Sequence, residues 1–422
     1  MNFEVLKRSH VKRNILIGVI IVLILSAIIL TFTKAKYKIT ESMPLVNGTI
    51  NYELSDFNLI GAYIQTEGEE YKQTNEIPIS GYEFNSEKSY CTVNDENINA
   101  TLNYDMETQT LSVVPLTTKG TKCYLYFDEK ASSVTDVIED AYEENQDMLA
   151  YDGTVDNNLR YIGANPNNYV YFNCDDYNNP SSSTCELWRI IGIFNENSHG
   201  ISGEKLVKLI RSNSLGNTEW DSSRDYSWVD PNNNWSTSSV KDMFNGDYLN
   251  RTGSYSTSGI KENTQNFIAN AEWKLGGSRN HADATPAIYY QRERRTAVPS
   301  GNPTTWNGKI ALMYASDYGY ATSGGTSISR EECLNKEIFN WYGTGCYNND
   351  WLYKSSNGEW LLNISDSSSG LAYAIFKTES GGYIQSNSIS ESYAVTPTLY
   401  LSPEISITGG DGSRTNPYTL QN

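Results

Sequence analysis

Histidine is scarce in this sequence. The 422-residue chain has three histidines, of which His199 and His281 lie beyond residue 38. Hydrolysis by a Ser-His-Asp triad needs a histidine that a carboxylate orients. His281, followed two residues later by Asp283, comes nearest to this arrangement, but its surroundings are typical of a surface loop. The sequence therefore gives little support to a hydrolase of this kind.

An excess of basic residues is also lacking. The chain has 32 Lys and Arg against 50 Asp and Glu, a net charge of −18, and seven of the basic residues fall within residues 1–38. A surface this acidic repels nucleic acid, so we expect no nucleic-acid partner. The acidic residues are dispersed along the chain, which favours a role in solubility.

Cysteine is absent before residue 91, and six cysteines follow. An even number confined to this part of the chain indicates an oxidising compartment. Cys91 and Cys123 occupy two predicted strands, and we expect them to pair. The other four are expected to form two local disulfides, Cys174 with Cys185 and Cys333 with Cys346.

Long apolar runs are absent apart from one near the N-terminus. Eighteen consecutive uncharged, mostly apolar residues fill Ile15–Phe32, and as a helix they would be about 27 Å long, close to the hydrocarbon thickness of a bilayer. Basic residues flank the run on both sides. With the cysteine distribution they favour a cytosolic segment over residues 1–14, a signal-anchor helix over residues 15–33 that contacts membrane lipid, and an extracellular remainder.

A cleaved signal peptide is the alternative to this single-pass protein of the cell membrane. The run is longer than the apolar core of most signal peptides, and Thr31–Lys36 lacks an A-x-A cleavage site. We therefore expect the anchor to be retained.

Tryptophan is absent before residue 188, although the chain has nine. This change in composition predicts two aqueous domains. Residues 38–130 contain short runs with strand character separated by turn residues, such as Thr110–Val114 and Cys123–Phe127. They predict a small Ig-like β-sandwich that acts as a spacer.

Residues 131–150 predict a connecting helix, because Ser133 and Asp136 have capping-box spacing and an apolar stripe follows. Residues 151–422 predict a loop-rich α+β domain. Its expected elements include strands at Tyr169–Phe172, Leu187–Phe194 and Lys309–Tyr314, and a short helix at Lys261–Asn270.

Several motifs in this second domain carry a family resemblance. They are Trp188–Phe194, Leu312–Ala321, Val395–Leu401, Ile407–Gly412 and Asn416–Leu420. Together they resemble an uncharacterised family of Firmicute surface domains that is distantly similar to the C-type lectin fold and to formylglycine-generating enzymes. The resemblance covers about residues 151–420. It implies a surface location and a compact, disulfide-tied, C-type-lectin-like α+β module, and the family brings no established activity with it.

The sequence gives little support to either of two further classes of enzyme. An oxidase similar to formylglycine-generating enzyme would need reactive, copper-binding thiols, whereas the cysteines of this domain have nearby disulfide partners. A glycoside hydrolase uses two carboxylates that leave no spacing signature. An envelope-acting hydrolase therefore stays open as an alternative.

The segment Trp220–Trp235 is the best binding candidate. Aromatic residues alternate there with Asp, Asn and Arg, and flat aromatic faces beside amide and carboxylate groups suit the recognition of a sugar or a peptide. The alternative is that these tryptophans anchor a loop-rich core. The predicted ligand-binding residues are Trp220, Arg224, Trp228, Asp230, Asn232 and Trp235.

Calcium is the ion for which the sequence offers oxygen ligands. The candidate clusters are Asp152 with Asp156, Asn157 and Asn158; Asp175 with Asp176; and Asp230 with Asn232, Asn233 and Asn234. None of them has EF-hand spacing, and Asx-rich turns explain each without an ion. We therefore expect no cofactor, with calcium as the alternative.

Arg292–Arg295 is a basic exception in the acidic second domain. It is either a solvated turn or a site for an acidic ligand.

Taken as a whole, the sequence predicts a membrane-anchored cell-surface protein that displays a non-catalytic binding module for an extracellular glycan, peptide or protein. The alternatives are an envelope-acting hydrolase that uses carboxylates and a structural component of the envelope.

Overall fold

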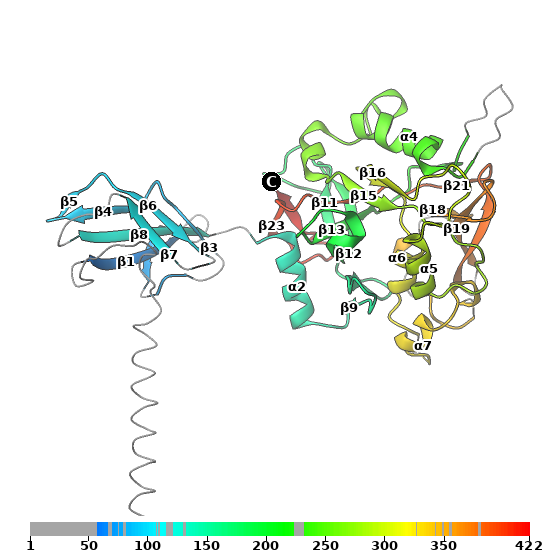
Figure 1. Ribbon diagram of the computed structural model, residues 1–422, viewed down its shortest axis with the longest axis horizontal. Helices are drawn as coiled ribbons and strands as arrows, with labels where there is room; N and C mark the ends of the chain where they lie inside the picture. The colour runs from blue at the N-terminus through cyan, green and yellow to red at the C-terminus, as the bar shows by residue number, and fades with distance from the viewer. Residues whose placement is uncertain are drawn as a thin grey trace, which may run out of the picture. The chain divides into compact units, whose positions relative to one another are not determined.

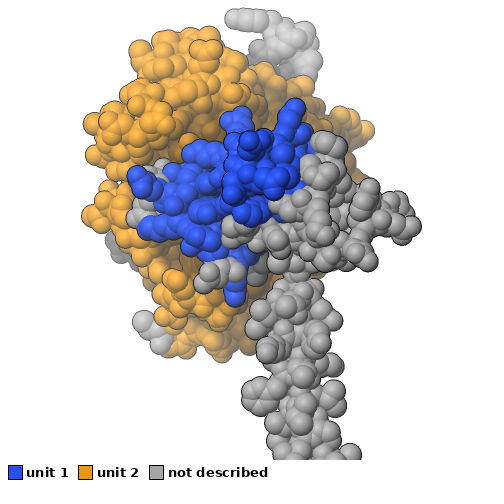
Figure 2. All heavy atoms as spheres, turned by 90° about the vertical axis from the view of Figure 1, so that its left-hand side faces the viewer, with its two compact units in different colours: residues 1–131 blue, residues 132–422 orange. Residues whose placement is uncertain are grey.

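The chain divides into two compact units, Met1–Ala131 and Ser132–Asn422, which Figure 2 colours separately. The structure is a computed structural model. It describes residues 57–65, 70–74, 76–78, 82–106, 108, 110–114, 121–129, 132–222, 232–325, 327–341, 343–347, 350–353, 357–378 and 381–422. The fold is α+β, with many strands and few helices (Figure 1). The predicted anchor at residues 15–33 lies outside the described residues. Within them, no helix has both the length and the apolar character needed to cross a membrane.

Unit 1 consists of strands in its described part. They are β1 (Phe57–Gln65), β2 (Lys72–Thr74), β3 (Tyr82–Phe84), β4 (Tyr90–Val93), β5 (Glu96–Asn97), β6 (Thr101–Asp105), β7 (Thr110–Val114) and β8 (Thr121–Glu129). A six-stranded sheet has the order β2-β1-β8-β4-β5, with β3 also paired to β8, and β6 pairs with β7 in a separate two-stranded sheet. β8 runs parallel to β1 and antiparallel to β4.

Alternation along the strands explains the core of unit 1. In β8, Cys123, Leu125 and Phe127 are buried, and the residues between them are half-buried. Leu102 of β6 and Leu111 of β7 belong to the same buried cluster. The two sheets therefore enclose one apolar core.

The disulfide of unit 1 lies within a single sheet. Cys91 of β4 and Cys123 of β8 are direct cross-strand partners, with their Cα atoms 4.1 Å apart. In antibody domains the disulfide joins two facing sheets instead. The predicted pairing is confirmed, but its geometry differs from that of an immunoglobulin.

The described residues of unit 2 form two large sheets and two small ones. The seven-stranded sheet has the order β17-β22-β13-β12-β10-β9, with β11 also paired to β12. Its strands are β9 (Leu149–Tyr151), β10 (Leu159–Tyr161), β11 (Tyr169–Phe172), β12 (Glu186–Phe194), β13 (Leu206–Arg211), β17 (Ile310–Ala311) and β22 (Thr398–Tyr400). The five-stranded sheet has the order β14-β21-β18-β19-β20. Its strands are β14 (Asn217–Glu219), β18 (Glu359–Ile364), β19 (Leu371–Thr378), β20 (Gly381–Ser388) and β21 (Ser392–Ala394).

The small sheets pair β15 (Ala271–Lys274) with β16 (Thr305–Gly308), and β23 (Ser406–Gly409) with β24 (Thr419–Gln421). The α-helices are α2 (Val134–Glu144), α3 (Glu196–His199), α4 (Ser239–Met243), α5 (Pro286–Glu293), α6 (Ala315–Tyr320) and α7 (Arg330–Leu334). The 3₁₀ helices are η2 (Trp235–Thr237), η4 (Gly253–Tyr255), η5 (Glu262–Phe267), η6 (Ile338–Asn340) and η7 (Asp350–Leu352), and η3 (Phe244–Tyr248) is a π-helix.

β12 lies inside the seven-stranded sheet, and every residue from Trp188 to Phe194 is buried. This is why the segment reads as one continuous apolar run. Gly192 lies where the register with β13 shifts. A Cβ atom at this position would lie 2.1 Å from the carbonyl oxygen of Leu159 in β10, so only glycine allows the two strands to approach.

The predicted connecting helix is present as α2 and belongs to unit 2. The Ser133 side chain accepts a hydrogen bond from the Asp136 backbone N–H at 3.1 Å, so the predicted N-cap is confirmed. Val134 and Ile138 are buried, and the helix packs against β13 and β23.

Two predicted elements of unit 2 were wrong in type or extent. Within Lys309–Tyr314, Ile310 and Ala311 alone form strand β17, because helix α6 begins at Ala315. The Asp317 carboxylate causes this start by accepting the Tyr314 N–H at 3.0 Å. The predicted helix at Lys261–Asn270 is the shorter 3₁₀ helix η5, and the Lys261 N–H before it is bound to Asn173 at 2.7 Å.

Candidate functional site

Trp220 and Trp235, two of the predicted ligand-binding residues, lie in the core. Their exposed fractions are 0% and 1%, and their ring centroids are 5.7 Å apart. Trp220 donates its indole N–H to the Leu361 carbonyl at 3.1 Å, and Trp235 contacts the ring of Trp306. The alternative interpretation of these tryptophans as core anchors is therefore correct for both, and neither ring presents a face to a ligand.

Of the other four members of that set, the structure describes Asn232 alone. Arg224, Trp228 and Asp230 lie outside the described residues. Asn232 is half-buried and forms a local turn, since its side-chain oxygen accepts the Asn234 N–H at 2.9 Å. Its own N–H is bound to Asp221.

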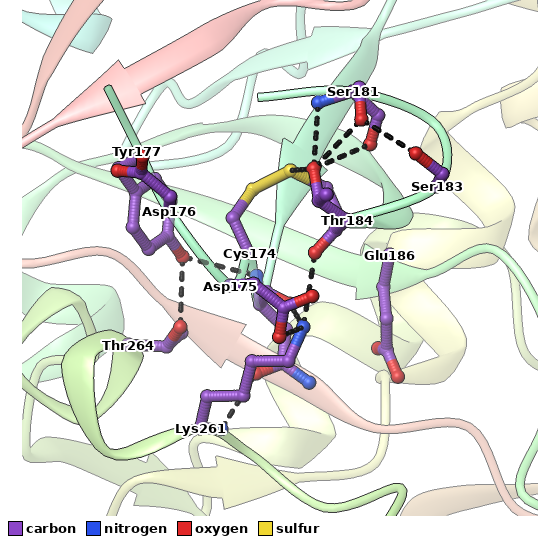
Figure 3. The surroundings of a disulfide bond; sticks show 12 residues. Cys174, Asp175, Asp176, Tyr177, Ser181, Ser183, Thr184, Glu186, Lys261 and Thr264 are labelled. Atoms are coloured by element: carbon purple, nitrogen blue, oxygen red, sulfur yellow. Dashed lines mark hydrogen bonds and ion pairs between the residues drawn. A yellow bond between two sulfur atoms is a disulfide. The ribbon is translucent and has the colours of Figure 1, made fainter. Parts of the chain in front are cut away.

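All three predicted disulfides are present, a pattern typical of secreted and extracellular proteins. They join Cys91 to Cys123, Cys174 to Cys185 and Cys333 to Cys346. Figure 3 shows how the second closes the hairpin between β11 and β12. Lys261 pins this hairpin, because its Nζ lies 3.1 Å from the Thr184 carbonyl oxygen and 3.0 Å from the Asp175 carboxylate.

Two of the acidic residues proposed as calcium ligands, Asp152 and Asp156, are bound to other side chains of the fold. Asp152 is buried and binds the Arg160 guanidinium at 3.0 Å. Asp156 is buried and accepts a hydrogen bond from the Tyr290 hydroxyl. In the described part of the chain, no three His, Cys, Asp or Glu side chains are grouped so as to hold a metal ion.

A recess on the surface of unit 2 is lined in part by the basic motif Arg292–Arg295, through Arg294 and Arg295. We call it the Arg295 recess, and its volume is about 460 Å³. The recess is formed by α3 and the loop after it, the end of β15, the segment after α5, and the start of β16. Its lining residues are Glu196, Asn197, Gly200, Ser202, Lys274, Arg294, Arg295, Thr296, Thr304 and Thr305.

Arg295 is the cation of this recess that has no bonding partner among the described residues. Its side chain is exposed and makes no hydrogen bond or ion pair with any residue that the structure describes. Lys274, by contrast, pairs with Glu272. The hydroxyl groups of Thr304 and Thr305 also have no partner among the described side chains and backbone groups. The recess thus offers one free guanidinium beside free hydroxyls.

Arg294 is fixed at the inner wall. Its guanidinium carbon lies 3.3 Å from the centroid of the Tyr290 ring. Its Nη2 donates to the Ser198 hydroxyl at 3.1 Å, and its Nε lies 3.4 Å from the Asp156 carboxylate. These contacts neutralise Arg294 and hold it in one position, so it supports the shape of the recess.

Glu293 fixes the end of α5, from which the chain enters the recess. It accepts hydrogen bonds from the Ser316 hydroxyl at 2.6 Å, the Ser316 N–H at 3.1 Å and the Asn363 amide at 3.1 Å. Burial raises the pKa of the Glu293 carboxyl above its ordinary value, although Arg294, whose Nη1 lies 3.6 Å from the carboxylate, opposes the change. The α5 terminus is therefore attached to α6 and β18.

Unit 2 also contains a buried chain of four charged side chains. Asp152, Arg160, Asp317 and Lys208 alternate in sign, and Asp317 lies 2.6 Å from both cations. Burial lowers the pKa of Lys208 to about 8, although Asp317 opposes the change. Burial also acts against ionised Asp317, but Lys208 and Arg160 outweigh it and keep the pKa of this carboxyl below its usual range. All four groups are therefore charged at neutral pH, and they tie β10, β13 and α6 together.

The two histidines do not form a catalytic pair with a carboxylate. His199 is buried at the end of α3. His281 is partly exposed and contacts the ring of Phe339. Asp283, the residue considered as its partner, binds Arg292 at 2.9 Å instead.

Sequence reasoning identified Arg292–Arg295 but missed the rest of the recess. Lys274, Thr304 and Thr305 lie on β15 and β16 or beside them, and these strands were not predicted. The pairing of Lys274 with Thr305 brings the two segments together. No local spacing pattern connects residues from such separate segments.

No protein-family model matches the chain, and no match was found among curated proteins or solved structures.

Proposed function

We propose that the chain is a single-pass cell-surface protein whose second unit is a non-catalytic binding module for an extracellular ligand. In this proposal residues 15–33 form the membrane anchor and unit 1 is an Ig-like spacer. Unit 2 is a C-type-lectin-like module that uses the Arg295 recess as its binding site, in place of the segment Trp220–Trp235.

The observation that carries the proposal is the Arg295 recess itself. Its volume of about 460 Å³ falls within the range of small-molecule sites. Arg295, Thr304 and Thr305 line it together with Arg294, which is bonded to Ser198 and stacked on Tyr290. Polar groups that have no internal partner are available to a ligand, although ordering the Arg295 side chain on binding costs about 0.5–1.5 kcal/mol.

Disulfides support the extracellular part of the proposal, since they form and persist in oxidising environments. The Cys174–Cys185 and Cys333–Cys346 bonds both lie in unit 2. A module that is stabilised in this way suits display outside the cell.

The test is an array of glycans and envelope polymers, probed with the full chain in detergent, with and without calcium. The recess variant carries Thr304→Val and Thr305→Val, which remove two free hydroxyls at little cost in volume. Thr257→Val, at an exposed position, is the matched control.

We expect saturable binding by the wild type and the control, and a loss of binding by the recess variant. Calcium dependence would indicate an ion-assisted site. Absence of saturable binding by a folded, oxidised chain, or equal binding by the recess variant, would overturn the proposal.

A further inference from the structure

The free groups of the Arg295 recess also define the chemistry of a ligand. Arg295 is exposed and without a partner among the described residues, whereas Arg294 is paired with Asp156 and Lys274 with Glu272. One of the three cations is therefore available. An arginine fork binds a planar carboxylate through two parallel hydrogen bonds, a geometry that a lysine ammonium does not offer.

The surrounding charge limits how negative the ligand can be. Glu196 is part of the recess lining, and the whole chain carries a net charge of −18. A phosphate monoester brings about −1.5 to −2 charges, more than one free guanidinium neutralises. A long polyanion would extend over the acidic surface and be repelled there. A single carboxylate fits this balance best.

The remaining lining groups suit a polyhydroxylated ligand. Ser202, Thr296, Thr304 and Thr305 contribute hydroxyls that act as both donors and acceptors. The Glu196 carboxylate, already bound to the Gly203 N–H at 2.7 Å, keeps further acceptor sites. Such a mixture matches the hydroxyl groups of a sugar ring.

From these contacts we infer that the Arg295 recess binds a sugar unit that carries one carboxylate, such as a hexuronic acid within an extracellular glycan. The carboxylate lies against the Arg295 guanidinium, and the ring hydroxyls bond the threonines and Glu196. This inference rests on the proposed function, because it specifies the ligand of the same site.

The test compares matched acidic and neutral sugars with the full chain in detergent at low salt. The probes are the methyl glycosides of glucuronic and galacturonic acid, the corresponding glucoside and galactoside, and glucose 6-phosphate. Binding is followed by ligand-observed NMR titration. Arg295→Gln removes the charge, and Arg279→Gln is the control at an arginine outside the recess lining, which is 77% exposed and lies 3.6 Å from Asp366.

We expect at least one uronide to bind at least about tenfold more tightly than its neutral counterpart, the gain of a hydrogen-bonded charge pair. Arg295→Gln removes this preference, and Arg279→Gln retains it. The preference also shrinks as salt is raised.

Equal affinity for acidic and neutral sugars, or a preference that survives in Arg295→Gln, would overturn the inference. Tighter binding of glucose 6-phosphate than of the uronides would overturn it as well. If neutral sugars bind and the Thr304→Val/Thr305→Val variant loses them, the proposed function holds and the carboxylate assignment fails. If no probe binds here and nothing binds on the array, both proposals fail.

Discussion

Acid should destabilise unit 2 through His199. The imidazole is buried, and backbone groups occupy both of its nitrogens. Nε2 lies 3.1 Å from the Phe194 carbonyl oxygen, and Nδ1 accepts the Ile201 N–H at 3.2 Å. These contacts assign the neutral ring with its proton on Nε2, and a second proton on Nδ1 would break the bond to Ile201.

The size of the effect follows from the pKa. Burial lowers the pKa of His199 from 6.5 to about 4. Between these values the unfolded chain binds a proton that the folded chain excludes, so stability is lost as pH falls through this interval. The fall in pKa corresponds to about 3 kcal/mol of unfolding free energy.

Urea unfolding followed by tryptophan fluorescence measures this effect, because all nine tryptophans lie in unit 2. The free energy of unfolding is compared at about pH 7 and about pH 4.5 for the wild type and for His199→Gln. Other titrating groups act alike in both proteins, so the wild type should lose about 2–3 kcal/mol more than the variant. His281→Gln is the comparison: burial lowers the pKa of His281 as well, so this variant should reduce the acid-dependent loss, but by less than His199→Gln does. Identical pH dependence in the wild type and His199→Gln would refute the reasoning.

Three further changes test the packing of unit 2, each by urea unfolding at neutral pH. Asp317→Asn leaves two buried cations short of a counter-charge and should lower the free energy of unfolding by about 3–5 kcal/mol. A loss below about 1 kcal/mol, which is the contribution of a single surface ion pair, would contradict the buried network. Gly192→Ala forces a methyl group against a neighbouring strand and should cost at least about 2 kcal/mol, whereas Gly246→Ala, which meets no atom within 4 Å, should stay within about 1 kcal/mol of the wild type. Replacing both Cys174 and Cys185 by Ser opens a short loop and should cost roughly 2–3 kcal/mol; unchanged stability would show that Lys261 alone holds the hairpin.

Local patterns predicted local structure well. β7 and β11 have the predicted bounds, because alternation and β-branched or aromatic residues determine a strand within a few positions. The α2 cap was also predictable from local sequence, because Ser133 and Asp136 are three residues apart. Close cysteine spacing likewise indicated the correct disulfides in unit 2.

What the sequence could not predict depends on distant partners. Helix α6 interrupts an apolar run because Asp317 turns inward to Lys208 and Arg160, which lie far away in the chain. Trp220 looked like a ligand platform because its neighbours in sequence are polar, yet its indole packs against Trp235 and bonds the Leu361 carbonyl. Burial of this kind is a property of the packed core and leaves no local signal.

The position of β22 has a consequence for biosynthesis. This strand, at Thr398–Tyr400, lies between β13 and β17 in the seven-stranded sheet. A ribosome that makes the chain from its N-terminus completes β13 nearly two hundred residues before it supplies β22. Until then, one side of β13 has exposed backbone donors and acceptors that can pair with other chains. During synthesis, aggregation of unit 2 therefore competes with folding until β22 is available. A chain truncated before residue 398 lacks β22 and would keep the unpaired edge of β13 permanently.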